Sequence, residues 1–168
     1  NLISSYINLE NIDFINSNSD SLDLDFVYGN LKNIIIRNSK NDGLDISGSK
    51  VEVSNIKIIN SADKAISVGE KSKISIENFN IKNAYIGIAV KDGSSLILDS
   101  NFVEGRDLSI IEGTEYAITA YQKKQEFGSA NIIAGNMYAD YKSLKMINNK
   151  DNYFIEKGSK LHLGNKEY

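Results

Sequence analysis

Two pairs of aspartates in this chain are separated by the same interval of 22 residues: Asp42 follows Asp20, and Asp45 follows Asp23. If 22 residues make one turn of a repeated structure, Asp23 and Asp45 lie on adjacent strands about 5 Å apart and face the same way. Like charges directly opposite each other destabilise a sheet. A bound cation, a raised pKa on one carboxyl or screening by solvent must therefore relieve them.

Lys64 follows Asp42 at the same interval, and Asp63 precedes Lys64. A lysine stacked beside Asp42 would neutralise part of this acidic cluster. The same residues also have a purely structural interpretation. Aspartate is frequent just before a strand, because its side chain bonds the neighbouring backbone, and an aspartate on an outer face is usually in contact with solvent. The spacing leaves both interpretations open.

The strands that would position these residues follow from the apolar side chains. Within each unit these side chains alternate over short stretches, as in Leu22, Leu24 and Phe26, and a period of two indicates strands rather than helices. The aliphatic residues that keep the interval of 22 are Leu22, Leu44, Ile66, Ile88, Leu24, Ile46, Val68 and Val90. Self-similarity at a fixed period means that one structural unit is stacked on copies of itself.

Asparagines mark the corners between the short strands. Val53 and Ile56 are both apolar but three residues apart, so the chain must turn between them, and Asn55 occupies the turn. Asparagine tolerates the left-handed conformation that a sharp corner requires. The two columns of asparagine are Asn11, Asn33, Asn55 and Asn78, and Asn16, Asn38, Asn60 and Asn83. We expect the amides of each column to hydrogen-bond to one another along the stack.

Three short strands per unit and 22 residues per turn predict an all-β fold, a single-stranded parallel β-helix in which each strand pairs with its copy one coil along. A leucine-rich solenoid has a similar period but requires a helical segment per repeat, and a propeller blade requires a longer period. We expect coils over residues 1–133, with an insertion near 105–113, and an irregular C-terminal capping segment over 134–168. The chain begins inside a coil, so we expect it to be a fragment of a longer chain with additional domains.

Composition excludes several classes of function. The net charge is -3, and only two of the 19 basic residues, Arg37 and Arg106, are arginines. This composition gives no basic stripe for nucleic acid. No cysteine is present, which excludes disulfides and thiolate metal sites. No apolar run approaches the ~18 residues that a membrane-spanning helix requires.

The asparagine corner followed by three strands resembles the right-handed β-helices of the pectate-lyase-like superfamily. The run Asn41, Asp42, Gly43, Leu44 and Asp45 also looks like the acidic motif of polygalacturonases. The resemblance implies an all-β right-handed β-helix and a polysaccharide that lies along its outer face. The glycine–histidine motif and the basic arginine–isoleucine–lysine signature of the superfamily are both missing.

The same resemblance implies roles for the acidic residues. The implied catalytic residues are Asp42, Asp45 and Lys64, and the implied substrate contacts are Asp20, Asp23 and Asp63. Two carboxylates act as acid and base in glycoside hydrolysis. A calcium-dependent lyase would instead bind calcium through Asp23 and Asp45 and use a lysine or arginine as its base.

The regular repeat and the incomplete active-site motifs favour a noncatalytic β-helical module of a larger bacterial protein that is secreted or on the cell surface. Such a module serves as a rigid scaffold or as a surface that binds carbohydrate or a partner. The alternative is part of a polysaccharide lyase or glycoside hydrolase that acts on uronate-type polymers through the acidic outer face.

Overall fold

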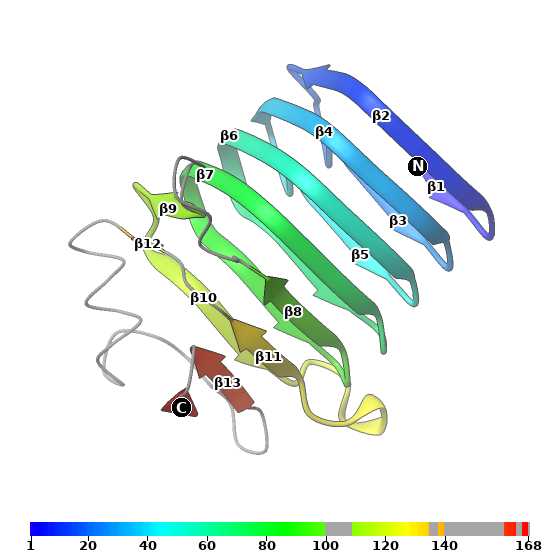
Figure 1. The fold of residues 1–168 in the computed structure, drawn as a ribbon, viewed down its shortest axis with the longest axis vertical. Helices are drawn as coiled ribbons and strands as arrows, with labels where there is room; N and C mark the ends of the chain where they lie inside the picture. The colour runs from blue at the N-terminus through cyan, green and yellow to red at the C-terminus, as the bar shows by residue number, and fades with distance from the viewer. Residues whose placement is uncertain (100–108, 135–137, 140–159, 164–165, 168) are drawn as a thin grey trace.

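The computed structural model describes residues 1–99, 109–134, 138–139, 160–163 and 166–167, and these residues are mostly in strands. The strands form a solenoid whose successive coils stack along one axis (Figure 1). In chain order they are β1 (Leu2–Ile3), β2 (Tyr6–Ile15), β3 (Leu22–Asp25), β4 (Tyr28–Ser39), β5 (Leu44–Ser47), β6 (Lys50–Gly69), β7 (Lys73–Lys91), β8 (Ser95–Asp99), β9 (Ile110–Glu112), β10 (Tyr116–Tyr121), β11 (Asn131–Ala134), β12 (Tyr138–Ala139), β13 (Lys160–Leu163) and β14 (Lys166–Glu167). A short 3₁₀ helix, η1 (Gln125–Phe127), precedes β11.

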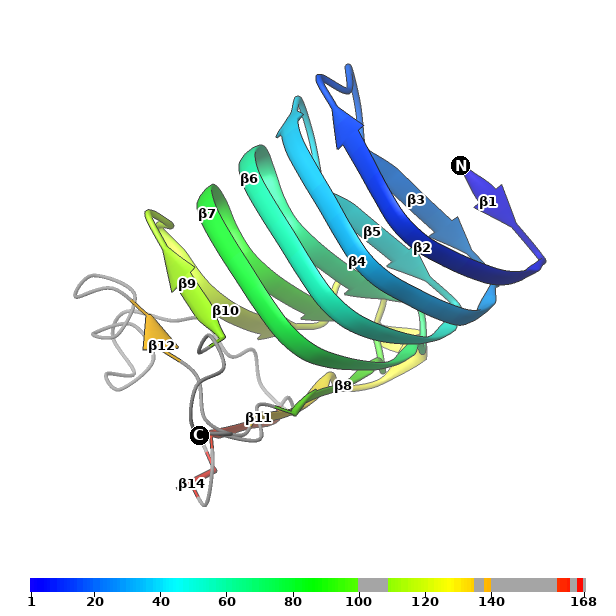
Figure 2. The same cartoon turned by 45° about the horizontal axis from the view of Figure 1, so that its top comes forward.

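Parallel pairing between successive coils builds two sides of the solenoid. On the front side, β2 pairs with β4, β4 with β6 and β6 with β7. On the back side, β3 pairs with β5, β5 with the C-terminal end of β6, and the C-terminal end of β7 with both β6 and β10. Figure 2 shows the long strands curving from one side to the other. We call the second set the back sheet. The predicted parallel β-helix is confirmed.

The core consists of ladders of like residues. Leu22 pairs with Leu44, Leu44 with Ile66, and Ile66 with Ile88, and none of the four is more than 5% exposed. Burial of apolar surface contributes roughly 25 cal/mol per Å². A single coil cannot bury its own apolar face, so each coil depends on its neighbours for stability.

The predicted ladder through Asn16, Asn38, Asn60 and Asn83 is confirmed, and the other ladder is confirmed over Asn11, Asn33 and Asn55. All eight asparagines have a φ angle between 52° and 61°. This is the left-handed conformation, which asparagine accepts more readily than most residues. Five of the side-chain amides donate a hydrogen bond to the asparagine one coil before, and the structure shows no such bond from Asn78 to Asn55. The nitrogen–oxygen distances are 2.9 Å for Asn33 to Asn11, 3.0 Å for Asn55 to Asn33, 2.8 Å for Asn38 to Asn16, 2.9 Å for Asn60 to Asn38 and 3.1 Å for Asn83 to Asn60.

The C-terminal part of the expected insertion belongs to the coil. Ile110–Glu112 forms β9, which pairs with residues 80–82 of β7. The sequence hides this pairing because 30 residues, rather than 22, separate Ile81 from its partner Ile111. Farther on, β11 pairs in parallel with β8 and β13, and β13 pairs with β14 in the antiparallel direction. Most of the expected cap over 134–168 and the first part of the insertion lie outside the described residues.

Substitutions of Asn60 test how much the corners contribute to the free energy of unfolding. Asn60 donates to Asn38, accepts from Asn83 and has a φ of 61. Alanine at this position loses both bonds and must hold a left-handed backbone, whereas glycine loses the same bonds without that strain. We expect Asn60→Ala to lower the free energy of unfolding by about 2 kcal/mol, and Asn60→Gly to lower it by clearly less. Urea unfolding measures both variants, and equal losses would show that the backbone conformation contributes nothing.

Candidate functional site

The predicted site residues lie on the outer face of the back sheet and at the corner that precedes it. Asp23 pairs with Asp45, as the spacing predicts, and both side chains face outward, away from the core residues Leu22 and Leu24. Their row, which we call the outer row, continues through Ser67, Ala89 and Thr119. A second outward row contains Asp25, Ser47, Gly69, Lys91 and Tyr121.

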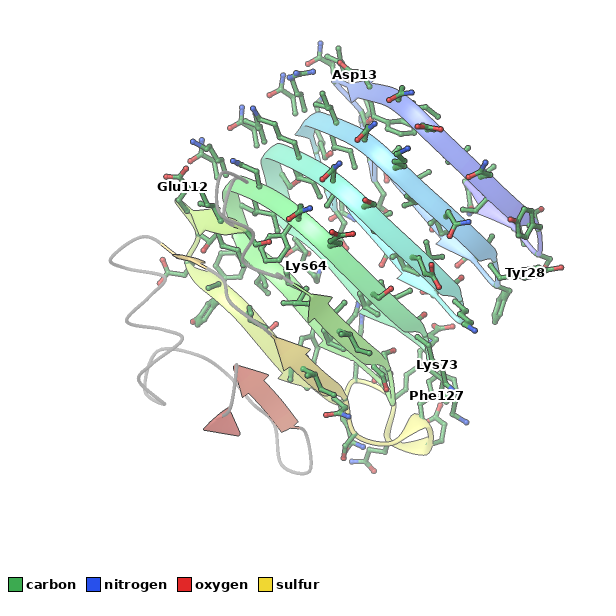
Figure 3. The ribbon with its side chains drawn as sticks, viewed as in Figure 1. Asp13, Tyr28, Lys64, Lys73, Glu112 and Phe127 are labelled. Atoms are coloured by element: carbon green, nitrogen blue, oxygen red, sulfur yellow. The ribbon has the colours of Figure 1, made fainter. Side chains whose placement is uncertain are left out.

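At the corner, each aspartate bonds to the backbone of the next coil. Asp20 Oδ1 accepts a hydrogen bond from the Asp42 N–H at 2.8 Å, and Asp42 Oδ1 accepts one from the Lys64 N–H at 3.0 Å. Lys64 Nζ also lies 3.2 Å from Asp42 Oδ1 and forms an ion pair with Asp63. Lys64 lies about midway along the stack of coils (Figure 3). We call Asp20, Asp42, Asp63 and Lys64 the corner network.

Electrostatics in the corner network favour a charged lysine. Burial raises the pKa of Asp42, while the hydrogen bonds and the charge of Lys64 act against this shift. Burial lowers the pKa of Lys64, but its bonds to Asp63 and Asp42 and their charges outweigh burial, so the pKa rises. A general base must be neutral before it takes up a proton. The ion pair therefore suits a structural role for Lys64 better than the catalytic role that the resemblance implies.

Mutual repulsion acts on Asp23. Burial raises its pKa, and the charges of Asp25, Asp45 and Asp20 raise it further. This is one of the three forms of relief that the spacing predicts. In the parts of the chain that the structure describes, no three histidine, aspartate or glutamate side chains are arranged to hold a metal ion. Calcium at Asp23 and Asp45 would need backbone or water oxygens as further ligands, and it stays a prediction.

Lys91, in the second outward row, is absent from the residues predicted from the sequence. Its side chain lies across Gly69, where a Cβ would stand 3.5 Å from Lys91 Cε and 4.0 Å from Nζ. The ammonium makes no hydrogen bond or ion pair with the described residues. Lys91 follows Gly69 by 22 residues, so the repeat could have predicted that Lys91 lies in the same row.

The Lys91 ammonium is partly desolvated. Burial lowers its pKa, the charges of Asp45 and Asp42 oppose that shift, and the charge of Lys64 adds to it. A buried charge without a partner costs free energy, and a shift of the pKa toward the neutral form reports that cost. The lysine therefore gains from any ligand that supplies a hydrogen-bond acceptor.

Three oxygen atoms of the outer row also lack a partner. Asp45 Oδ1, Ser67 Oγ and Thr119 Oγ1 are shielded from solvent and make no hydrogen bond in the structure. Ser67 and Thr119 are only 0% and 3% exposed. Buried polar atoms are nearly always paired, and an unpaired one costs about 1–3 kcal/mol. We call Asp45, Ser67, Lys91 and Thr119 the outer-face cluster; it combines an unpaired donor with oxygens that a polar ligand would satisfy.

Alanine variants of Asp42 and Asp45 compare how much the corner network and the outer-face cluster contribute to the free energy of unfolding. Asp42→Ala removes the acceptor of the Lys64 N–H and one of two carboxylates that neutralise its ammonium. We expect it to lower the free energy of unfolding by about 2–3 kcal/mol. Asp45→Ala should leave that free energy unchanged or raise it, because it removes a buried oxygen that makes no bond. Guanidinium unfolding compares the two variants, and equal losses would contradict a structural role for Asp42.

Comparison with known proteins leaves the fold and the site to be argued from this chain alone. No protein-family model, curated protein or solved structure matches it. Within the described residues, no helix has the length and apolar character needed to cross a membrane. What the outer face binds therefore has to follow from its side chains.

Proposed function

We propose that this chain is a noncatalytic β-solenoid module of a larger extracellular or cell-surface bacterial protein, and that its outer-face cluster binds an acidic carbohydrate. The observation that carries this proposal is that Lys91, which makes no hydrogen bond or ion pair with the described residues, lies on the same sheet face as three unpaired buried oxygens. The resemblance to pectate-lyase-like β-helices, in which polysaccharides lie on the outer face, supports the carbohydrate and the location.

The chemistry of an acidic sugar matches the cluster group by group. A carboxylate accepts a hydrogen bond from the Lys91 ammonium and strengthens it with charge. When the side chains that shield these oxygens move aside, sugar hydroxyls donate to Asp45 Oδ1, and they donate to or accept from the Ser67 and Thr119 hydroxyls. The Asp45 charge lies near enough to act on Lys91, so a ligand with one carboxylate per sugar fits better than one with a denser negative charge.

The corner network supports a noncatalytic module. Asp42 has 5% of its side chain exposed, and its Oδ1 bonds to both the backbone and the ammonium of Lys64. Lys64 is held protonated by Asp63 and Asp42. Lys64 is therefore not free to accept a proton from a substrate at neutral pH.

A polysaccharide lyase is the second candidate, and the lowered pKa of Lys91 favours it. In β-elimination, a base removes the proton on the carbon next to the sugar carboxylate, and a lysine does so in its neutral form. Lys91, rather than Lys64, would then be the base. In this candidate, Asp23 and Asp45 would hold calcium against the substrate carboxylate.

Calorimetric titration with oligogalacturonate and with its methyl ester tests the proposal. We expect the acid form to bind at least about tenfold more tightly, because only it offers a charged partner to Lys91. Lys91→Met should abolish that preference. The control Lys123→Met removes an equal charge from an exposed lysine outside the cluster, and should leave it intact. Equal binding of acid and ester, or equal effects of the two variants, would contradict the proposal.

The pH dependence and the product separate binding from lyase chemistry. A carboxylate prefers protonated Lys91, so affinity should fall as pH rises through the lowered pKa of Lys91, and Lys91→Arg should remove this fall. Ultraviolet absorbance detects the unsaturated sugar that elimination produces. Binding without absorbance supports the module, whereas absorbance that requires Lys91 and calcium would establish the lyase instead.

A further inference from the structure

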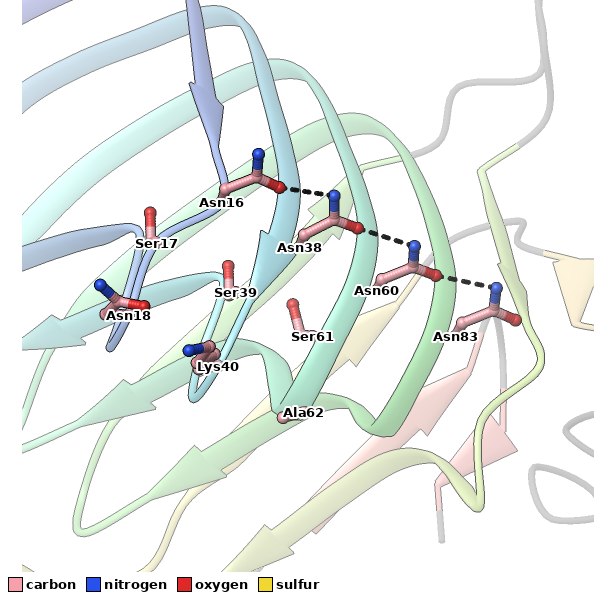
Figure 4. A pocket seen from close by; sticks show the side chains of 10 residues that line it. All are labelled: Asn16, Ser17, Asn18, Asn38, Ser39, Lys40, Asn60, Ser61, Ala62 and Asn83. Carbon is pink, nitrogen blue, oxygen red and sulfur yellow. Dashed lines mark hydrogen bonds between the residues drawn. The ribbon is translucent and has the colours of Figure 1, made fainter.

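A shallow groove runs along the second asparagine ladder, on the corner that leads from the front side into the corner network. It has a volume of about 860 Å³. Figure 4 shows the ladder along one wall and the serines beside it. Its lining residues are Asn16, Asn38, Asn60 and Asn83 in the ladder, Ser17, Ser39 and Ser61 beside it, and Asn18, Lys40 and Ala62 at the opposite edge. We call this feature the ladder groove.

The ladder leaves hydrogen-bonding capacity at regular intervals. Asn38 and Asn60 each use one amide N–H and one oxygen lone pair within the ladder. A side-chain amide has two N–H donors and two lone pairs, so each retains one donor and one acceptor. Neighbouring coils are roughly 4.8 Å apart. The groove therefore offers the same pair of groups repeatedly along the solenoid axis, an arrangement suited to a polymeric ligand.

A buried hydroxyl beside the ladder also lacks a partner. Ser21 Oγ bonds to both Ser17 and Ser39 in the first coils. Gly43 precedes Leu44 as Ser21 precedes Leu22, so the next coil has no hydroxyl at this position. Ser61 is 4% exposed, and its Oγ makes no hydrogen bond in the structure. It is a second observation, independent of the groove's shape, that indicates a missing polar partner.

An exposed aromatic residue, Tyr85, follows two residues after Asn83, the last asparagine that lines the ladder groove. Ser61 pairs with Ala84, so Tyr85 takes the place of Ala62 or Asp63 one coil along. Tyr85 is 52% exposed, and Tyr116 holds its ring edge to face, with centroids 5.6 Å apart. The amphipathic face of a fixed tyrosine ring is a platform for a sugar ring.

The charges of the lining residues indicate whether the groove suits a neutral or a charged polymer. Among the described residues that line the groove, Lys40 is the one charged residue and none carries a carboxylate. A neutral ligand with many hydroxyls can donate to and accept from the free amide groups. We propose that the ladder groove binds a neutral glycan chain along the solenoid axis, with one sugar ring stacked on Tyr85. This site is distinct from the outer-face cluster in both residues and ligand.

Titration of the chain with neutral oligosaccharides of β-linked glucose, xylose and mannose tests this proposal. We expect at least one to bind, and Tyr85→Ala to weaken its binding about fivefold through loss of the stacked ring. Ala62→Arg, an exposed position at the groove edge, should fill the groove and abolish binding. Tyr28→Ala is the matched control, because Tyr28 is 58% exposed and packs edge to face on Tyr6 but lies outside the groove.

Several outcomes would overturn the proposal. These are no binding of any neutral oligosaccharide, binding that Ala62→Arg and Tyr85→Ala leave unchanged, and an equal loss in Tyr28→Ala. Binding of an extended peptide in place of the sugars would show that the groove receives a protein instead. Lys91→Met should leave neutral binding unchanged, so failure here and failure of the acidic-carbohydrate proposal are distinguishable. Thermal unfolding checks that each variant is folded.

Discussion

The register of parallel pairing, 22 residues per coil with one added residue between the front parts of β6 and β7, is the constraint on which the rest of the structure depends. Each strand obtains its backbone hydrogen bonds from a copy of itself one coil along, so every residue faces its own equivalent. A slip of one residue would turn an entire strand over and place its aliphatic ladder in water. The uninterrupted ladder from Leu22 to Ile88 shows that burial holds the register, because each of its members is almost fully enclosed.

The same register makes columns of polar residues, and each column acquires its chemistry from how the residue type changes along it. A column that stays asparagine becomes a ladder and fixes the backbone. One that changes from Asp42 to Lys64 becomes an ion pair that stabilises a corner. Where the column changes from Asp45 to the small, buried Ser67, the oxygens lose their partners. Surfaces able to bind a ligand therefore arise where equivalent residues of successive coils no longer supply each other's hydrogen-bond partners.

Features that depend on residue type at a fixed interval could be predicted from the sequence. These include the strands, the asparagine corners, the opposition of Asp23 and Asp45, and the position of Lys64 beside Asp42. The sequence could not predict the unpaired state of Lys91, because it depends on the path of a long side chain across Gly69. Nor could it predict the contact of Tyr85 with Tyr116, since an irregular number of residues separates these two rings.

Pairwise cysteine cross-linking tests the register most directly, because the chain has no cysteine of its own. Glu52 and Ser75 are register partners, so their Cα atoms lie roughly 4.8 Å apart, within the range that a disulfide spans. The account predicts that a Glu52→Cys, Ser75→Cys variant oxidises readily to an intramolecular disulfide. A Glu52→Cys, Glu77→Cys variant, shifted by two residues to about 8 Å, should not. Equal oxidation of both variants, or oxidation of the second alone, would contradict the register and every column derived from it.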